Sequence, residues 1–212
     1  MSYSGTASLY RLDDVLEVKG YDVDNYAQDT EMVMRLHHHL HSLKKPYQIR
    51  FNPAAAVWTD VPSTLRGLSK QRDRWQRGII KSVLKYSSMF LNPFYKIQGL
   101  FSYPVYVLLE VVAPIVECTA YVSVGLAYYY GILNGTTAIL YMLLAWGFTS
   151  YLTIANMFMN LVTFNRYKNI NDIFWMFSLA FIEMFGYRQY LTVVKLWGTF
   201  HYFINRLRGK AI

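Results

Sequence analysis

Residues 136–164 contain no charged side chain, and this stretch limits the possible folds of the chain more than any other feature. A run of this length and composition is typical of a helix that crosses a lipid bilayer. A second long apolar run, residues 100–133, precedes it, and the uncharged turn at 134–135 is expected on the outer side of the membrane. The next loop carries Arg166 and Lys168 and is therefore expected in the cytoplasm.

Composition supports a membrane protein. Hydrophobic residues make up 54% of the chain, aromatic residues 17% and charged residues 16%, which argues against an ordinary soluble domain. The net charge of +8 comes from basic residues before and between the apolar runs, a pattern of membrane anchoring rather than nucleic-acid binding. The single cysteine, Cys118, excludes an intramolecular disulfide, and no Cys/His spacing suits zinc. No signal peptide is expected, since the first apolar run begins roughly a hundred residues in.

Residues 1–99 are more polar and predict mixed α/β structure. A helix opened by Pro62, with Ser63 as its N-cap, is expected to run to about Gln76. The remaining elements predicted in this part are strands at 8–10, 47–51 and 54–58 and helices at 13–18 and 29–43.

The last apolar segment, residues 173–204, has two possible topologies. A single crossing would leave Arg206 and Arg208 outside, against the charge rule, so a hairpin that breaks near Gly186 is favoured. Carboxylates within the apolar part are expected to face protein or a wet cavity, either lining a channel or pairing between helices. Asn156 and Asn160 are candidates for hydrogen bonds between helices. The carboxylates are Glu110, Glu117 and Glu183.

The run Gln71-Arg72-Asp73-Arg74-Trp75 carries the most chemical information. On a helix, Gln71, Arg74 and Trp75 share one face. An amide, a guanidinium fork and an aromatic plate together suit a sugar joined to a phosphate. Taken alone, the same cluster also fits a helix that enters a membrane surface.

The order of several short segments resembles the second half of a processive, membrane-embedded family 2 glycosyltransferase. This group includes cellulose synthase, hyaluronan synthase and poly-N-acetylglucosamine synthase. The resemblance implies an α/β partial GT-A glycosyltransferase domain followed by an α-helical transmembrane region. The segments are Ser4-Gly5, Leu9-Tyr10-Arg11, Gly20-Tyr21-Asp22, Gln28-Asp29-Thr30-Glu31, Arg35-Leu36, Tyr47, Asn52-Pro53-Ala54, Trp58-Thr59-Asp60-Val61-Pro62, Thr64-Leu65 and the run 71–75.

By this resemblance Asp29 is the catalytic general base, which takes a proton from the acceptor hydroxyl. A helix N-cap is the alternative role for Asp29. The family commonly has Glu where Gln28 stands, and Gly where Lys19 stands. The implied acceptor- and nucleotide-binding residues are Gln71, Arg72, Arg74, Trp75, Ser4 and Gly5. Solvation remains an alternative for Arg72, as does loop geometry for Ser4 and Gly5.

The resemblance also implies a half that the sequence does not contain. Family members use Mg2+ or Mn2+ held by an aspartate pair upstream, and we expect no metal ligands in this chain. Asp22 and Asp24 are predicted to be loop residues, and Asp13 and Asp14 to begin a helix. The histidines at 37–39 and 41 are interpreted as a surface helix face rather than a metal site. A split enzyme with a second polypeptide, a fragment, and an inactive relic all remain open.

The resulting hypothesis is an inverting glycosyltransferase, or the acceptor-side half of one, that needs a partner carrying the UDP- and metal-binding half. It would transfer sugar from a UDP-sugar to a growing polysaccharide and translocate it; a non-catalytic membrane scaffold or transporter-like subunit is the alternative. A multi-pass protein of the bacterial inner membrane, with a cytoplasmic catalytic part and no nucleic-acid partner, is expected. The predicted parts are a GT-A portion (1–84), an interfacial segment with Lys85 and Lys96 near headgroups (85–103), and transmembrane helices with a basic tail (104–212).

Overall fold

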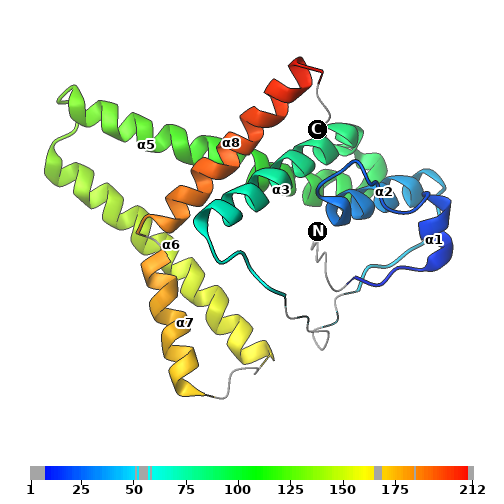
Figure 1. Ribbon diagram of the computed structural model, residues 1–212, viewed down its shortest axis with the longest axis horizontal. Coiled ribbons are helices and arrows are strands. Elements are labelled where there is room, and N and C mark those ends of the chain that lie inside the picture. Colours follow the sequence, from blue (N-terminus) through cyan, green and yellow to red (C-terminus); the bar gives the residue numbers. More distant parts are fainter. Residues whose placement is uncertain are drawn as a thin grey trace. The chain divides into compact units, whose positions relative to one another are not determined.

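The computed structural model describes residues 8–50, 52, 57, 59–164, 169–183 and 185–209, and in these ranges all regular structure is helical (Figure 1). They divide into two compact units: one comprises the residues up to Ile115 and those from Val194, the other Val116–Val193. In chain order the helices are α1 (Leu12–Glu17), α2 (Gln28–Ser42), α3 (Leu65–Lys85), η1 (Ser87–Met89), η2 (Pro93–Tyr95), η3 (Gln98–Ser102), α4 (Tyr103–Val107), η4 (Leu108–Val112), α5 (Ala113–Tyr129), α6 (Gly135–Phe164), α7 (Ile170–Glu183) and α8 (Tyr187–Leu207).

The two helices predicted nearest the amino terminus are confirmed as α1 and α2. The first turn of α1 contains Asp13 and Asp14, and that of α2 contains Asp29 and Glu31. Carboxylates are favourable at these positions because the unpaired amide groups of a helix N-terminus carry a partial positive charge.

Helix α3 begins later and ends later than predicted. Its N-cap is Thr64, whose Oγ1 accepts a hydrogen bond from the Gly67 amide at 3.1 Å, so the assignment of Ser63 as the cap is wrong by one residue. The helix continues past Gln76 to Lys85 because Ile80 and Val83 extend its buried apolar face by two further turns.

The predicted strands are not observed in the described residues. Residues 8–10 and 47–50 have no regular structure, and most of the third predicted strand, at 54–58, lies outside the described residues. A strand is stable only when a neighbouring strand pairs with its backbone groups, and neither segment has such a neighbour within the part of the chain that the structure describes. The α/β arrangement is therefore not confirmed.

The core of the first unit lies between α2, α3 and the segment that follows α3. Met34 and Met89 are completely buried, and Tyr103 is 1% exposed. The hydroxyl of Tyr103 donates to the carbonyl of Val83 at 2.5 Å, which satisfies its polar atom inside the core. Burial of each large side chain contributes about 1.5–3 kcal/mol to folding.

The apolar segment Gln98–Tyr129 is a continuous helical run with two π-helical turns. Each π turn, η3 or η4, comes shortly before a proline, Pro104 or Pro114. Proline lacks an amide hydrogen and crowds the preceding turn, and local widening of the helix relieves this conflict.

Among the residues that the structure describes, two helices could cross a membrane by length and composition: Gln98–Tyr129 and Gly135–Thr163. They correspond to the two long apolar runs in the sequence. The later segment is interrupted at Gly186, where φ is 96°, and so divides into α7 and α8 as expected. Its membrane topology remains a prediction.

Within the second unit, Glu117 of α5 contacts protein groups, as expected for a carboxylate in an apolar run. It accepts hydrogen bonds from Tyr121 at 2.7 Å and Thr192 at 3.0 Å, and Arg188 lies 3.9 Å from it. In α6, by contrast, Asn160 donates to Asn156 of the same helix, at 2.8 Å to its carbonyl. This bond within one helix replaces the bond between helices that the sequence suggested.

The start of α2 approaches the middle of α3 closely at Gly78. A Cβ atom on Gly78 would lie 2.4 Å from the Ala27 nitrogen and 2.8 Å from Asn25 Oδ1, so only hydrogen fits. One turn later, Ser82 Oγ accepts a hydrogen bond from Asn25 Nδ2 at 2.8 Å, and Asn25 Oδ1 accepts one from the Ala27 amide at 2.9 Å. Asn25 is 1% exposed and joins the first turn of α2 to α3.

We expect Gly78→Ala to lower the thermal unfolding midpoint, measured by circular dichroism in detergent micelles. Alanine normally stabilises a helix interior, but overpacking against the backbone of Ala27 should cost about 1–3 kcal/mol and outweigh that gain. Gly147→Ala in α6 is the matched control, because a Cβ there meets nothing within 4 Å. A Gly78→Ala midpoint at or above that of the control would contradict the close contact.

Candidate functional site

Asp29 is the second residue of α2, one position inside the helix. The helix N-cap is Ala27, so the alternative role of Asp29 as N-cap is wrong. The partly exposed Asp29 lines a small cavity of about 310 Å³, together with Gln28, Tyr21 and Tyr26. The carboxylate is thus accessible, in the first turn of a helix.

The run 71–75 lies on α3, as the sequence predicted. Arg74 and Trp75 are exposed, Trp75 by 44%, and Gln71 is half-buried. The guanidinium carbon of Arg72 lies 4.8 Å from the centre of the Trp75 ring. Within the described residues Arg72 Nε is buried and has no hydrogen-bond partner. Trp75 therefore lies beside a cation and has a large part of its side chain exposed to solvent.

The run 71–75, called the motif below, and the loop that precedes Asp29 lie on the same side of α3. The motif residues Gln71, Arg74 and Trp75 lie on the helix face that continues, at the i+3 and i+4 spacing, through Gly78 and Ser82. Those last two residues contact the loop that immediately precedes Asp29. Tertiary packing thus joins two features that the sequence placed more than forty residues apart.

A buried ionic cluster continues this contact towards the end of α3. Glu31 is completely buried, and its Oε1 accepts hydrogen bonds from Lys85 Nζ at 2.7 Å and from the Tyr86 hydroxyl at 2.6 Å. Arg35 forms an ion pair with the same carboxylate. Lys85 also contacts Asp22 Oδ2 at 3.0 Å. Two carboxylates thus hold the Lys85 ammonium group, and its position near lipid headgroups stays a prediction.

These contacts keep Glu31 ionised. Burial alone raises the pKa of Glu31, but the hydrogen bonds from Arg35, Lys85 and Tyr86 outweigh it and hold the pKa below its ordinary value. Burial, reinforced by the adjacent Glu31 carboxylate, raises the pKa of Tyr86 to about 12. The cluster is a fully paired charge network, which stabilises only while every member is present.

The opposite side of α3 contacts the helical segment around Glu110. Pro114 cannot donate to the carbonyl of Glu110 four residues earlier, and Gln76 Nε2 donates to that oxygen at 2.9 Å. Gln76 is 1% exposed and also lies 3.3 Å from Thr199 Oγ1 in α8. Lys195 of α8 pairs with the Glu110 carboxylate at 2.9 Å.

Asp73, the central residue of the motif, belongs to this side of α3. Its carboxylate pairs with Arg77 at 3.0 Å and with His201 Nδ1 of α8 at 3.0 Å. Asp73 therefore has a structural role, and the sequence analysis missed it. The i+4 spacing of Asp73 and Arg77 was the available signal.

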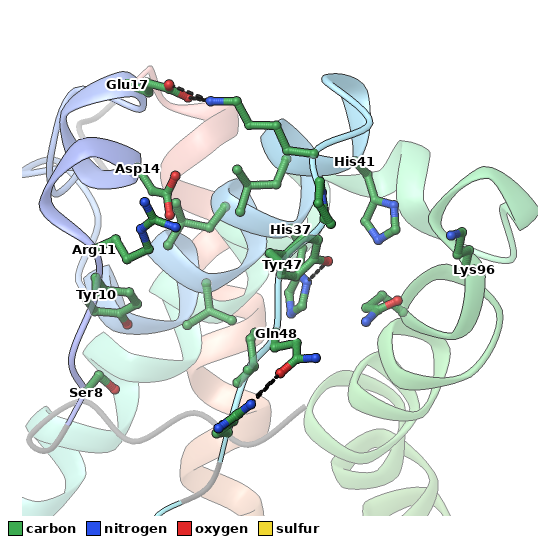
Figure 2. Close-up of a pocket in the computed structure, with 18 of the residues that line it drawn as sticks. Ser8, Tyr10, Arg11, Asp14, Glu17, His37, His41, Tyr47, Gln48 and Lys96 are labelled. Carbon is green, nitrogen blue, oxygen red and sulfur yellow. Dashed lines mark hydrogen bonds and ion pairs between the residues drawn. The ribbon is translucent and has the colours of Figure 1, made fainter.

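A second, larger cavity of about 2140 Å³ lies between α1, α2 and the segment 44–52, but neither Asp29 nor the motif lines it. Figure 2 shows His37, His41 and Tyr47 together in its wall, with His37 Nδ1 2.5 Å from the Tyr47 hydroxyl. His37 is 4% exposed, so the prediction of a histidine-rich surface face is wrong for this residue. His38 stacks on Tyr95, which places that ring against the core as well.

The described residues do not form a site for a divalent cation. None of their His, Cys, Asp and Glu side chains form a group of three or more that could hold a metal ion. Asp22 and Asp24 lie in a loop, as predicted, and Asp22 binds Lys85 through one oxygen and the Asp24 amide through the other. These carboxylates do not fit Mg2+ or Mn2+ coordination. Ser4 and Gly5, together with Trp58, lie outside the described residues.

Comparison with known proteins identifies the family. Residues 1–203 match the family model described as glycosyl transferase family group 2. The chain belongs to this family. The prediction of a family 2 glycosyltransferase is thereby confirmed, while the assignment to a carboxy-terminal half and to a membrane-embedded enzyme remains a prediction.

Curated relatives share the family. The chain is 30% identical over 106 residues to the poly-beta-1,6-N-acetyl-D-glucosamine synthase of Staphylococcus aureus strain COL; the match covers 50% of this chain and 23% of that protein. It is 34% identical over 88 residues to the probable glycosyltransferase YdaM of Bacillus subtilis, covering 42% of this chain and 20% of that protein. The chain thus matches less than a quarter of the length of either relative. No solved structure matches.

Stability of the protein should depend on pH through His37. Burial, with a smaller contribution from His41, lowers the pKa of His37 to about 4, from an ordinary value of 6.5. Between these values the unfolded chain binds a proton that the folded protein does not, so stability falls as the pH drops from about 6.5 towards 4. The loss attributable to His37 is at most about 3 kcal/mol.

The measurement is denaturant unfolding in detergent between pH 8 and pH 4.5. We expect His37→Asn to remove most of the decline below pH 6.5, and the range above pH 7 serves as the internal control because His37 does not titrate there. A decline of equal size in the variant and the native protein would show that another group is responsible.

Proposed function

We propose that this chain is the acceptor-side and membrane part of an inverting, processive polysaccharide glycosyltransferase. In this proposal it transfers sugar from a UDP-sugar to a growing glycan, with Asp29 as general base. The observation that carries the proposal is the packing of the Asp29 helix start onto Gly78 and Ser82, on the same α3 face as Gln71, Arg74 and Trp75. The loop that leads into the carboxylate of Asp29 therefore packs on the α3 face that carries Arg74 and the aromatic ring of Trp75.

Asp29 can act on an acceptor hydroxyl because its carboxylate lines an open cavity. In the proposed step the hydroxyl oxygen forms a bond to the anomeric carbon of the donor sugar, and its proton passes to Asp29. The bond between that carbon and the UDP oxygen breaks, and UDP leaves with the electron pair. General-base assistance of this kind contributes about 10²–10⁴-fold to the rate.

The motif supplies binding rather than proton transfer. Trp75 offers a broad, partly exposed ring on which a sugar near the acceptor terminus can stack. Arg74 is exposed, and Arg72 has a buried Nε with no partner in the described residues. A buried unsatisfied donor is uncommon and suits a ligand oxygen. We assign the pyrophosphate of the donor as the group that Arg74 meets, with Arg72, on another face of α3, assisting electrostatically.

The donor half is expected on other residues. Mg2+ or Mn2+ would neutralise the diphosphate when bound, and because the described carboxylates do not fit the metal, its ligands are placed on a second polypeptide or on further sequence. The same part would supply strands to complete an α/β GT-A domain, since a parallel sheet needs strands from both halves. Without it the chain should be inactive.

Two apolar helices support a membrane location for this protein. Gln98–Tyr129 and Gly135–Thr163 are long enough to span a bilayer. We propose a multi-pass protein of the bacterial inner membrane, with Asp29 on the cytoplasmic side and the product threaded outward. A non-catalytic scaffold is the second candidate, favoured by the absence of a metal-ligand group in the described residues.

Substitution of Asp29 separates these two functions. In membranes containing the complete enzyme, Asp29→Asn should lower incorporation of radiolabelled sugar into polymer by at least about 10²-fold, because asparagine cannot accept the proton. Membrane insertion, followed by flotation and protease protection, should be unchanged.

Asp24→Asn is the matched control, since Asp24 is an exposed acid of the preceding loop. Its carbonyl accepts from Lys81 at 2.8 Å and its amide donates to Asp22 Oδ1 at 3.1 Å, and both are backbone contacts that the substitution keeps. It should retain full incorporation. Polymer synthesis at the native rate by Asp29→Asn would refute the general-base role and favour the scaffold.

A further inference from the structure

The loop between α1 and α2 is fastened to α3 along one side. It begins with two left-handed residues, Lys19 at φ 65° and Gly20 at φ 72°, which turn the chain away from α1. Beyond them, Asp22 binds Lys85, Asn25 binds Ser82, and the Asp24 carbonyl accepts from Lys81, at 3.0, 2.8 and 2.8 Å. The loop backbone is therefore fixed before any ligand arrives.

The side chains on the other side of this loop are aromatic and accessible. Tyr21 is 47% exposed and Tyr26 is 51% exposed. Both line the cavity of about 310 Å³ that contains Asp29 and Gln28. Exposed aromatic rings on a rigid loop, beside a carboxylate, resemble a binding surface more than a piece of core.

Tyr26 is oriented by a cation on one face. The guanidinium carbon of Arg77 lies 4.9 Å from the centre of its ring, and Arg77 is itself paired with Asp73. Tyr21 follows directly after Lys19 and Gly20, whose left-handed backbone fixes the direction in which the chain leaves α1. A ring whose orientation is set in advance loses little conformational entropy when a ligand stacks on it.

The cavity lining discriminates between possible ligands. The described residues that line it supply one carboxylate, one amide and two phenol rings, and no cation. A pyrophosphate would meet the negative charge of Asp29 there without compensation, so the donor diphosphate does not suit this cavity. A neutral pyranose suits it, because its hydroxyls can bond to Asp29 and Gln28 while its apolar face covers an aromatic ring.

We propose that Tyr21 and Tyr26 form the two aromatic walls of an acceptor-sugar subsite beside Asp29. Tyr26 stacks on the pyranose ring, Tyr21 covers the opposite edge, and the hydroxyl to be glycosylated faces the Asp29 carboxylate. This inference rests on the proposed glycosyltransferase function and adds to it a subsite distinct from Trp75. It also explains why Arg77 is held by Asp73, since that pair fixes the ring of Tyr26.

The test is calorimetric titration of the full 212-residue chain in lipid nanodiscs with two probes, a β-1,6-linked N-acetylglucosamine trimer and a β-1,4-linked glucose trimer. We expect Tyr26→Ala to weaken binding of the preferred trimer roughly tenfold, as loss of one stacked ring implies, and Tyr26→Phe to stay within about twofold. Tyr21→Ala should weaken it about threefold or more. Tyr130→Ala, a change at a 70% exposed tyrosine outside this cavity, should have no effect.

The results of these titrations distinguish failure of the Tyr21 and Tyr26 subsite from failure of the proposed glycosyltransferase function. Unchanged affinity in Tyr26→Ala, or equal weakening by Tyr26→Phe and Tyr26→Ala, overturns the stacking role, whereas Asp29→Asn would still abolish transfer if the proposed function holds. Native protein that binds neither trimer overturns the subsite. Loss of transfer in Asp29→Asn with trimer affinity retained supports both, because binding and proton transfer then reside on different side chains. Circular dichroism of each variant establishes that the loss is not one of folding.

Discussion

The contact between Gly78 and Ala27 is the constraint on which the rest of the first unit depends. The start of α2 can come this close to α3 because Gly78, one turn after Trp75, has no side chain. The contact fixes the distance between the loop before Asp29 and the motif helix. Asn25 then fixes the orientation by bonding to Ser82 on one side and to the first turn of α2 on the other. Gly78 and Asn25 do not contact a substrate in the proposed reaction, but both determine the position of Asp29.

Buried charge extends this arrangement along α3. Glu31 has no exposed surface and is ionised only because Arg35, Lys85 and Tyr86 surround it. Removing one partner from such a network leaves an uncompensated buried charge, which costs far more than the network contributes when intact. As a consequence, α2 and α3 cannot slide relative to each other without breaking several charged contacts. That rigidity suits a site whose carboxylate must stay within hydrogen-bond reach of a hydroxyl.

The other side of α3 connects the motif to the apolar helical run. Pro114 removes one helix hydrogen bond, and Gln76 donates to the carbonyl that is left, while Asp73 pairs with His201 of α8. Residues at 73 and 76 therefore share a helix with Gln71, Arg74 and Trp75 but serve the opposite face. Helix α3 therefore has two sides at this point: one is available to ligands, and on the other the side chain of Gln76 bonds to the Glu110 carbonyl and to Thr199.

The sequence by itself determined the helices, the apolar runs and the family. Periodicity and capping residues are local, so α1, α2 and α3 could be predicted to within a few residues at their starts, and uncharged length sufficed for the two long apolar helices. The order of Asp29 and the run 71–75 sufficed to predict a family 2 glycosyltransferase.

Tertiary structure decided what local patterns do not contain. Strands at 8–10 and 47–50 did not form because a strand depends on a neighbour that may lie anywhere in sequence. Lys85 contacts carboxylates from α2 and from the loop before it, His37 is buried, and Tyr26 lies beside Asp29, because each position depends on which segments pack together. The run at 71–75 was visible in the sequence as a basic and aromatic helix face; only packing at Gly78 placed it on the same side of α3 as a carboxylate.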